Sequence, residues 1–226
     1  MKNKPVLTIV AILLVIALVL ILTNLKKPKT ELIVANSVED CKKILPAIEK
    51  YCEFSVEPQF QDENTLKETF NKFLPGAPIE NLPLIEQNIC SWTYSSSSTD
   101  VLNAFSNSTL LNQSEILGNL LTNQRASITI SFFKNQSVTN NIFNNKKADN
   151  ENRKEIDKEF IMQEFNSDYY ETQEITSPRL NQSKKIEVAS IYKKKDKALI
   201  SITQIRELNQ DPLCNLNKLK NWIESL

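Results

Sequence analysis

Four cysteines are the residues of this chain whose chemistry is easiest to place. Cys41, Cys52, Cys90 and Cys214 all follow an apolar N-terminal run. An even number of cysteines in a domain outside the cytosol is typical of disulfides. Free buried thiols and a four-thiolate metal site are the alternatives, but the chain has neither a Cys-x-x-Cys pair nor a histidine. Structural zinc sites normally use such ligands, so the sequence predicts two disulfides and no metal.

Four cysteines allow three pairings. On one continuous helix, a rise of about 1.5 Å per residue would put Cys41 and Cys52 about 16 Å apart, which is beyond the reach of a disulfide. Cys52 directly precedes a short run with strand character, which could lie beside the strand that begins at Cys90. We therefore expect the bridges Cys52–Cys90 and Cys41–Cys214. The alternative is Cys41–Cys90 with Cys52–Cys214.

Two absences limit the possible catalytic chemistry. The chain has no histidine, so a Ser-His-Asp or Cys-His nucleophile is excluded. It has two glycines, Gly76 and Gly118, which is too few for a phosphate-binding loop or a dinucleotide fingerprint. Carboxylate-pair or lysine chemistry survives, but no local pattern points to it. The sequence therefore predicts no cofactor and favours a domain without catalysis.

The first residues have the composition of a membrane anchor. Residues 5–25 carry no charge, and lysines flank the run on both sides. About 20 apolar residues are needed to span the hydrocarbon core of a bilayer. A cleaved signal peptide is the alternative, but it has a shorter apolar core and a small-residue cleavage site, which this run lacks. We expect an uncleaved transmembrane signal anchor over 1–29, held in lipid by residues 5–25.

The rest of the chain is expected outside the cytoplasm of a single-pass cell-membrane protein. The flanking lysines do not decide the orientation of the anchor. The predicted disulfides do, because they place the domain that carries them outside the cytosol. Five of the 27 basic residues flank the anchor and all 27 acidic residues follow it, so residues 30–226 carry five more acidic than basic side chains. Such a surface argues against nucleic acid as a partner. We divide the chain into an anchor at 1–29, a tether at 30–36 and an extracytoplasmic domain at 37–226.

The pattern of that domain predicts helices at both of its ends and strands between them. Ser37 and Asp40 form a capping signal, and Pro46 should restart the helix that follows it. Alternating residues predict strands at 89–94 and 126–134 and a hairpin of 185–193 with 198–206. Further expected elements are a short strand at 53–58, helices at 64–74 and 153–165, an edge strand at 169–175 and a helix that Asp211 and Pro212 open. No defined structure is expected at 138–151.

This order indicates an α+β fold with an antiparallel sheet flanked by helices. The expected core is Trp92, Ile128, Ile130, Phe132, Ile200, Ile202, Leu216 and Ile223. The helix start Asp40-Cys41-Lys-Lys-Ile-Leu-Pro46 and the strand Cys90-Ser-Trp-Thr-Tyr94 resemble the layout of small secreted lipoproteins with a PsbP-like fold. The resemblance implies a central antiparallel sheet and a binding or assembly accessory role, and it carries over no catalytic residue. The chain departs from such proteins in having no lipobox cysteine.

The function that we expect is therefore an accessory or ligand-binding domain, anchored in the membrane, with a possible protein partner in the cell envelope. The alternative is a hydrolase of envelope glycans. Glycosidases use two carboxylates about 5–10 Å apart across a cleft, and a sequence alone does not reveal such a pair.

Overall fold

A computed structural model describes residues 32–45, 47–73, 86–95, 124–177 and 185–226. Residues Ile33–Ile223 form one compact unit. The other residues, 1–32 and 224–226, group separately, and of these the structure describes Leu32 and the three C-terminal residues. The predicted anchor at 1–29 lies outside the described residues, as does Pro46, where a helix is expected to restart. None of the described helices is both long and apolar enough to cross a membrane.

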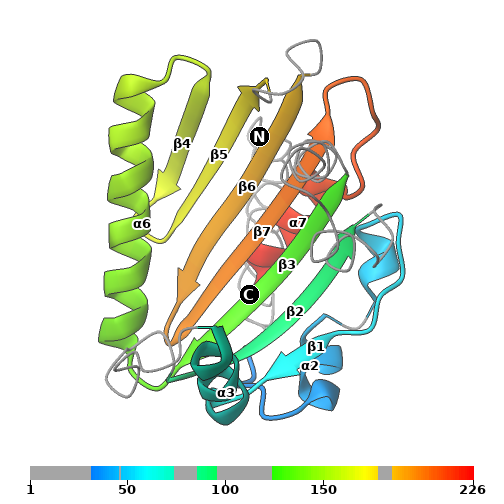
Figure 1. Ribbon diagram of the computed structural model, residues 1–226, viewed down its shortest axis with the longest axis vertical. Helices are drawn as coiled ribbons and strands as arrows, with labels where there is room; N and C mark the ends of the chain where they lie inside the picture. The colour runs from blue at the N-terminus through cyan, green and yellow to red at the C-terminus, as the bar shows by residue number, and fades with distance from the viewer. Residues whose placement is uncertain (1–31, 46, 74–85, 96–123, 178–184) are drawn as a thin grey trace, which may run out of the picture. The chain divides into compact units, whose positions relative to one another are not determined.

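The centre of the unit is a seven-stranded sheet in which all neighbouring strands are antiparallel. The strand order is β1-β2-β3-β7-β6-β5-β4 (Figure 1). The strands are β1 (Gln59–Gln61), β2 (Gln87–Ser95), β3 (Arg125–Phe133), β4 (Phe160–Asn166), β5 (Tyr169–Thr176), β6 (Ile186–Lys195) and β7 (Ala198–Glu207). Together with its helices, the sheet confirms the predicted α+β class.

Side chains alternate between the two faces of each strand, and one face of the sheet centre is almost entirely apolar. Across it, Trp92 lies opposite Ile128, and Ile128 lies opposite Ile202. Each of these side chains is at most 1% exposed. The expected core is confirmed except at Leu216, which is half-buried. We call this face, which α7 (Leu216–Ser225) covers in part, the inner face.

The opposite face packs against α6 (Gln136–Ile156), which runs alongside β4 in Figure 1. Phe143 of this helix meets Tyr170 edge-on, with ring centroids 5.3 Å apart, and Tyr170 stacks on Tyr192. Phe160 and Met162 of β4 complete the cluster. This aromatic layer holds the β4–β5–β6 end of the sheet to the helix.

This region differs most from the expectation. Helix α6 covers 138–151, where no defined structure is expected, and the first four residues of the helix expected at 153–165, whereas β4 takes the place of the last six residues of that expected helix. The sequence of α6 has no apolar stripe that would predict a helix, since Thr139 and Phe143 are its only buried residues. Its support comes instead from the Asn135 cap and from ion pairs to the sheet, such as Lys147 with Glu164. After Ile156, burial alternates as in a strand, because Phe160 and Met162 are buried and Ile161 between them is exposed.

The remaining helices lie near the strands at the other end of the sheet and under its inner face. They are α2 (Val38–Ile44), the short 3-10 helix η1 (Ile48–Lys50), α3 (Glu63–Phe73) and α7. Ser37 caps α2 as predicted, and α3 matches the helix expected at 64–74. The expected strand at 53–58 is wrong, because the strand that pairs with β2 lies at 59–61.

Two further expectations at the C-terminal half are corrected. The strand expected at 169–175 is present as β5, but it is an inner strand, because β4 occupies the edge. The C-terminal helix begins at Leu216 rather than after Asp211 and Pro212, because Cys214 takes part in a β-bridge with Cys52 and Asn215 caps the helix instead. The expected hairpin is confirmed as β6 and β7. Asp196 turns it with a φ of 50°, as a tight hairpin turn requires.

Candidate functional site

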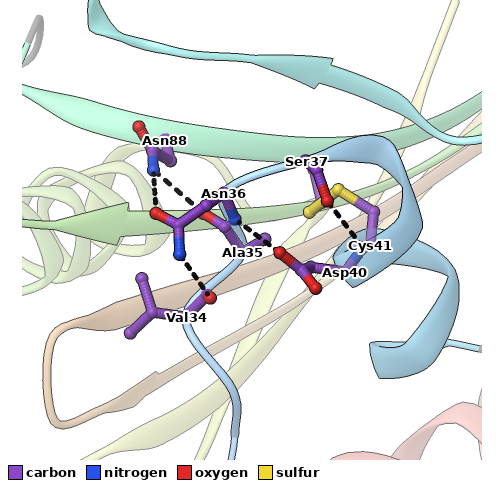
Figure 2. Close-up of a disulfide and its surroundings, with 8 residues drawn as sticks. Val34, Ala35, Asn36, Ser37, Asp40, Cys41 and Asn88 are labelled. Atoms are coloured by element: carbon purple, nitrogen blue, oxygen red, sulfur yellow. Dashed lines mark hydrogen bonds between the residues drawn. A yellow bond between two sulfur atoms is a disulfide. The ribbon is translucent and has the colours of Figure 1, made fainter.

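The first disulfide ties the N-terminal helix to the sheet. It joins Cys41 of α2 to Cys90 of β2, with the two Cα atoms 5.6 Å apart. Figure 2 shows how its surroundings fix the start of the domain: the Asn88 amide donates to the backbone carbonyl of Ala35 at 2.9 Å and to the Asn36 side chain at 3.3 Å. Asp40 accepts from the Asn36 backbone N–H at 3.1 Å. The hydrogen bonds with Asn36, Ser37 and Lys43 hold the pKa of the Asp40 carboxyl below its usual value, and the one with Lys43 contributes most.

The second disulfide joins Cys52 to Cys214, with the Cα atoms 3.9 Å apart. The two residues form an antiparallel bridge. On either side of it, the Glu53 N–H donates to the Leu213 carbonyl and the Asn215 N–H donates to the Tyr51 carbonyl, both at 2.7 Å. Opposite residues in such a non-hydrogen-bonded position lie closest together. This clamp joins the segment after η1 to the segment before α7.

The pairing is the alternative that the sequence left open, and the first expectation of Cys52–Cys90 with Cys41–Cys214 is wrong. The reason is the position of the strand beside β2. The sequence predicts that strand at 53–58, directly after Cys52, but β1 comes later, and Phe60 is the residue opposite Cys90. α2 lies against β1 and β2, which brings Cys41 to Cys90 and leaves Cys52 to meet Cys214. No cysteine is free.

A cleft opens on the inner face beside the Cys52–Cys214 clamp. Its volume is about 630 Å³, within the range of about 300–1,000 Å³ that is usual for ligand sites. Strands β4 to β7 form its floor, and the segment around Tyr51 and the start of α7 form its walls. Both clamp cysteines line it. The disulfide therefore fixes the relative position of the two walls.

A hydrogen-bonded network covers part of the floor. Glu187 of β6 accepts from the Gln173 amide through one carboxylate oxygen and from Arg206 Nε through the other, both at 2.5 Å. The Glu187 and Arg206 side chains are 10% and 21% exposed. Arg206 also donates to the Gln210 carbonyl. Beside this pair, the buried Gln204 accepts from the Cys214 N–H at 2.7 Å and so connects the floor to the clamp.

A second carboxylate of the floor is also engaged. Glu171 of β5 forms an ion pair with Lys220 of α7 at 2.5 Å and accepts from the Tyr169 hydroxyl. Lys220 also lies 5.8 Å from the centroid of the Phe165 ring. This arrangement fixes α7 above the β4–β5 end of the floor, because one lysine joins both strands to the helix.

The rim is more exposed. Glu49 accepts from the Ser55 hydroxyl at 2.5 Å, and this hydrogen bond holds the pKa of the Glu49 carboxyl below its usual value. Lys218 donates to the Lys50 carbonyl across the two walls at 3.4 Å. Tyr51 is half-buried and meets Trp222 at a centroid distance of 6.2 Å.

The floor carboxylates do not have the arrangement of a glycosidase pair. Glu187 lies opposite Ile175, four residues along β5 from Glu171, so their backbones are about 13 Å apart at about 3.3 Å per residue. Each carboxylate is engaged by its own cation. Among the described residues, no group of three or more histidine, cysteine or acidic side chains is placed to hold a metal ion.

Apart from Cys52 and Cys214, the sequence does not single out the cleft residues. The aromatic residues of the Cys90–Tyr94 motif do not line it: Trp92 is buried, and Tyr94 stacks on Phe54. The sequence does contain a signal for the Glu187–Arg206 ion pair of the floor. If the hairpin turn is placed at Asp196-Lys197, the strand register sets Glu187 opposite Arg206. Without that register, the strand pattern alone does not reveal the ion pair.

Comparisons with protein-family models, with curated proteins and with solved structures found no match to this chain. The resemblance to PsbP-like domains therefore stays a prediction.

Proposed function

We propose that this chain is a single-pass membrane protein that presents an extracytoplasmic binding or accessory domain, and that the cleft holds its ligand without chemical change. The observation that carries the proposal is the cleft itself, with Glu187 bound through both oxygens and Glu171 bound to Lys220. A general acid or base has to exchange a proton with the substrate. Carboxylates held in this way instead favour a rigid, preorganised binding surface.

The disulfides support the placement outside the cytoplasm, because stable disulfides are rare in reducing compartments. They also suit a small binding domain, since the Cys52–Cys214 bridge lies in the wall of the cleft. The anchor at 1–29 and the cell-membrane location remain predictions from the uncharged run at 5–25. The expected partner is a component of the cell envelope that reaches this domain beside the membrane.

Hydrogen exchange tests this proposal on the full chain in lipid nanodiscs. The protein is incubated with fractions of cell-envelope extract, and amide protection is mapped with and without each fraction. We expect at least one fraction to protect the wall around Tyr51 and the start of α7. Asn217→Trp should abolish that protection, because Asn217 is exposed and lines the cleft. Asn145→Trp, on the exposed part of α6, is the matched control.

A component that leaves the protein with an altered mass would contradict binding without catalysis. Protection that is absent from the cleft with every fraction, or that persists in Asn217→Trp, would show that the cleft is not the binding site.

A further inference from the structure

The charges that line the cleft cancel. Its carboxylates are Glu49, Glu53, Glu171 and Glu187. Its cations are Lys50, Arg206, Lys218 and Lys220. Because four of each sign line one cavity, no single-sign field draws in a phosphate, an acidic polymer or a polycation. The ligand that fits this balance carries little net charge.

Amide side chains are among the exposed residues that line the cleft. Gln163 of β4 and Asn217 of α7 both line it, and both are exposed. Gln173 is also exposed, and it uses its amide N–H₂ group towards Glu187. An amide offers a donor and an acceptor together, as does a hydroxyl group. Several such groups around one cleft match a ligand that is rich in hydroxyl or amide groups.

The cleft also has an apolar side. Ile161 of β4 is 58% exposed at one margin, and Tyr51 presents an aromatic ring with a polar tip at another. Tyrosine combines apolar area with one hydrogen-bonding group. A sugar ring needs this mixture, because its C–H faces are apolar while its edges carry hydroxyl groups.

An extended peptide fits less well. Peptides that bind sheets gain much of their affinity from main-chain hydrogen bonds along an open edge. Most of the floor here belongs to β5, β6 and β7, each of which has a strand on both sides. Their backbone groups are already used in the ladders, so a ligand on this part of the floor contacts side chains only.

We propose that the cleft binds a neutral oligosaccharide, held by the Gln163, Gln173 and Asn217 amides and by the Tyr51 ring. This inference rests on the proposed function, since it names the ligand class of the same cleft.

Isothermal titration of the full chain in nanodiscs, with four probes, tests this inference. Maltohexaose and chitohexaose are neutral, a hyaluronate hexasaccharide is anionic, and tetra-alanine is a peptide. We expect at least one neutral probe to bind. Gln163→Ala and Asn217→Ala should each weaken that binding about tenfold, the effect of losing one hydrogen bond of ordinary strength. Gln136→Ala and Asn145→Ala, exposed amides on α6, are matched controls that should change nothing.

Failure of both neutral probes, or binding that is unaffected by the two cleft variants, overturns the inference. If the hyaluronate or peptide probe binds instead and is weakened by Gln163→Ala, the ligand class is wrong while the binding function stands. If no probe and no envelope fraction engages the cleft, both proposals fail.

Discussion

Removal of the Cys52–Cys214 bridge gives the most specific test of the architecture. The two cysteines are 162 residues apart in sequence, whereas Cys41 and Cys90 are 49 apart. In the chain-entropy relation, the longer loop corresponds to about 5 kcal/mol of stabilisation and the shorter one to about 4 kcal/mol. The double variant Cys52→Ala/Cys214→Ala should therefore lose more unfolding free energy than Cys41→Ala/Cys90→Ala.

Structure adds a second reason for this order. The Cys52–Cys214 bridge carries two flanking backbone hydrogen bonds and the contact of Gln204 with the Cys214 N–H. Without the sulfurs the two walls are free to separate, so these hydrogen bonds weaken together with the bridge and add to the loss of stability. We expect a loss towards the upper end of the usual range of about 2–5 kcal/mol for native disulfides.

Urea unfolding of the full chain in detergent micelles, followed by tryptophan fluorescence, measures both losses. Trp222 of α7 and Trp92 of β2 report on the two regions that the bridges secure. A smaller loss for Cys52→Ala/Cys214→Ala than for Cys41→Ala/Cys90→Ala would refute the reasoning. Peptide mapping without reduction that recovers Cys52 joined to Cys90 would refute the pairing itself.

Three further outcomes are expected. The mature protein should retain residues 1–30 and stay with membranes after a carbonate wash; an N-terminus near residue 36 would contradict the anchor. Ile130→Ala, at a fully buried position, should cost about 2–5 kcal/mol in urea unfolding, whereas Ile156→Ser, at 85% exposure, should change stability by less than about 0.5 kcal/mol. Burial raises the pKa of Tyr170 above its usual value of 10.0, so its contribution to stability is complete below that pH and falls as pH rises above it, because only the unfolded chain ionises there. Tyr170→Phe should make the alkaline loss of stability less steep in thermal unfolding at pH 9–11, and an unchanged slope would contradict this assignment.

The parts of the fold that the sequence predicts well have strict local patterns. The alternation around Ile130 places β3 correctly, and the Ser37 cap starts α2 at the predicted residue. Strand alternation also gives the inner face of the β6–β7 hairpin. In each of these places, a few neighbouring residues are enough to predict the element, because the pattern is local.

The predictions from sequence fail where contacts between distant segments determine the structure. Helix α6 has only two buried residues, so no periodic apolar stripe marks it. Ile161 and Phe165 have helical spacing, which favours a helix over this segment. In the structure both are exposed on the edge strand β4. The disulfide pairing depends on which strand lies beside β2, and a misplaced three-residue strand was enough to exchange the partners.

Predicting the cleft also requires knowing which distant segments are neighbours in space. Glu187 and Arg206 are separate polar residues in two apolar strands, and only the hairpin register joins them. Lys220 reaches Glu171 from a helix that lies about 50 residues further along the chain. The Lys220–Glu171 pair has no recognisable spacing in the sequence, because the sheet and α7 bring the two residues together.

Native mass spectrometry of the full chain in nanodiscs tests the central claim most directly, after incubation with the envelope fraction that protects the cleft. Binding without catalysis predicts a one-to-one complex whose ligand keeps its mass over hours, and which Asn217→Trp removes while Asn145→Trp does not. A ligand that is shortened or otherwise changed in mass, or a complex that is equally abundant in Asn217→Trp, would contradict it.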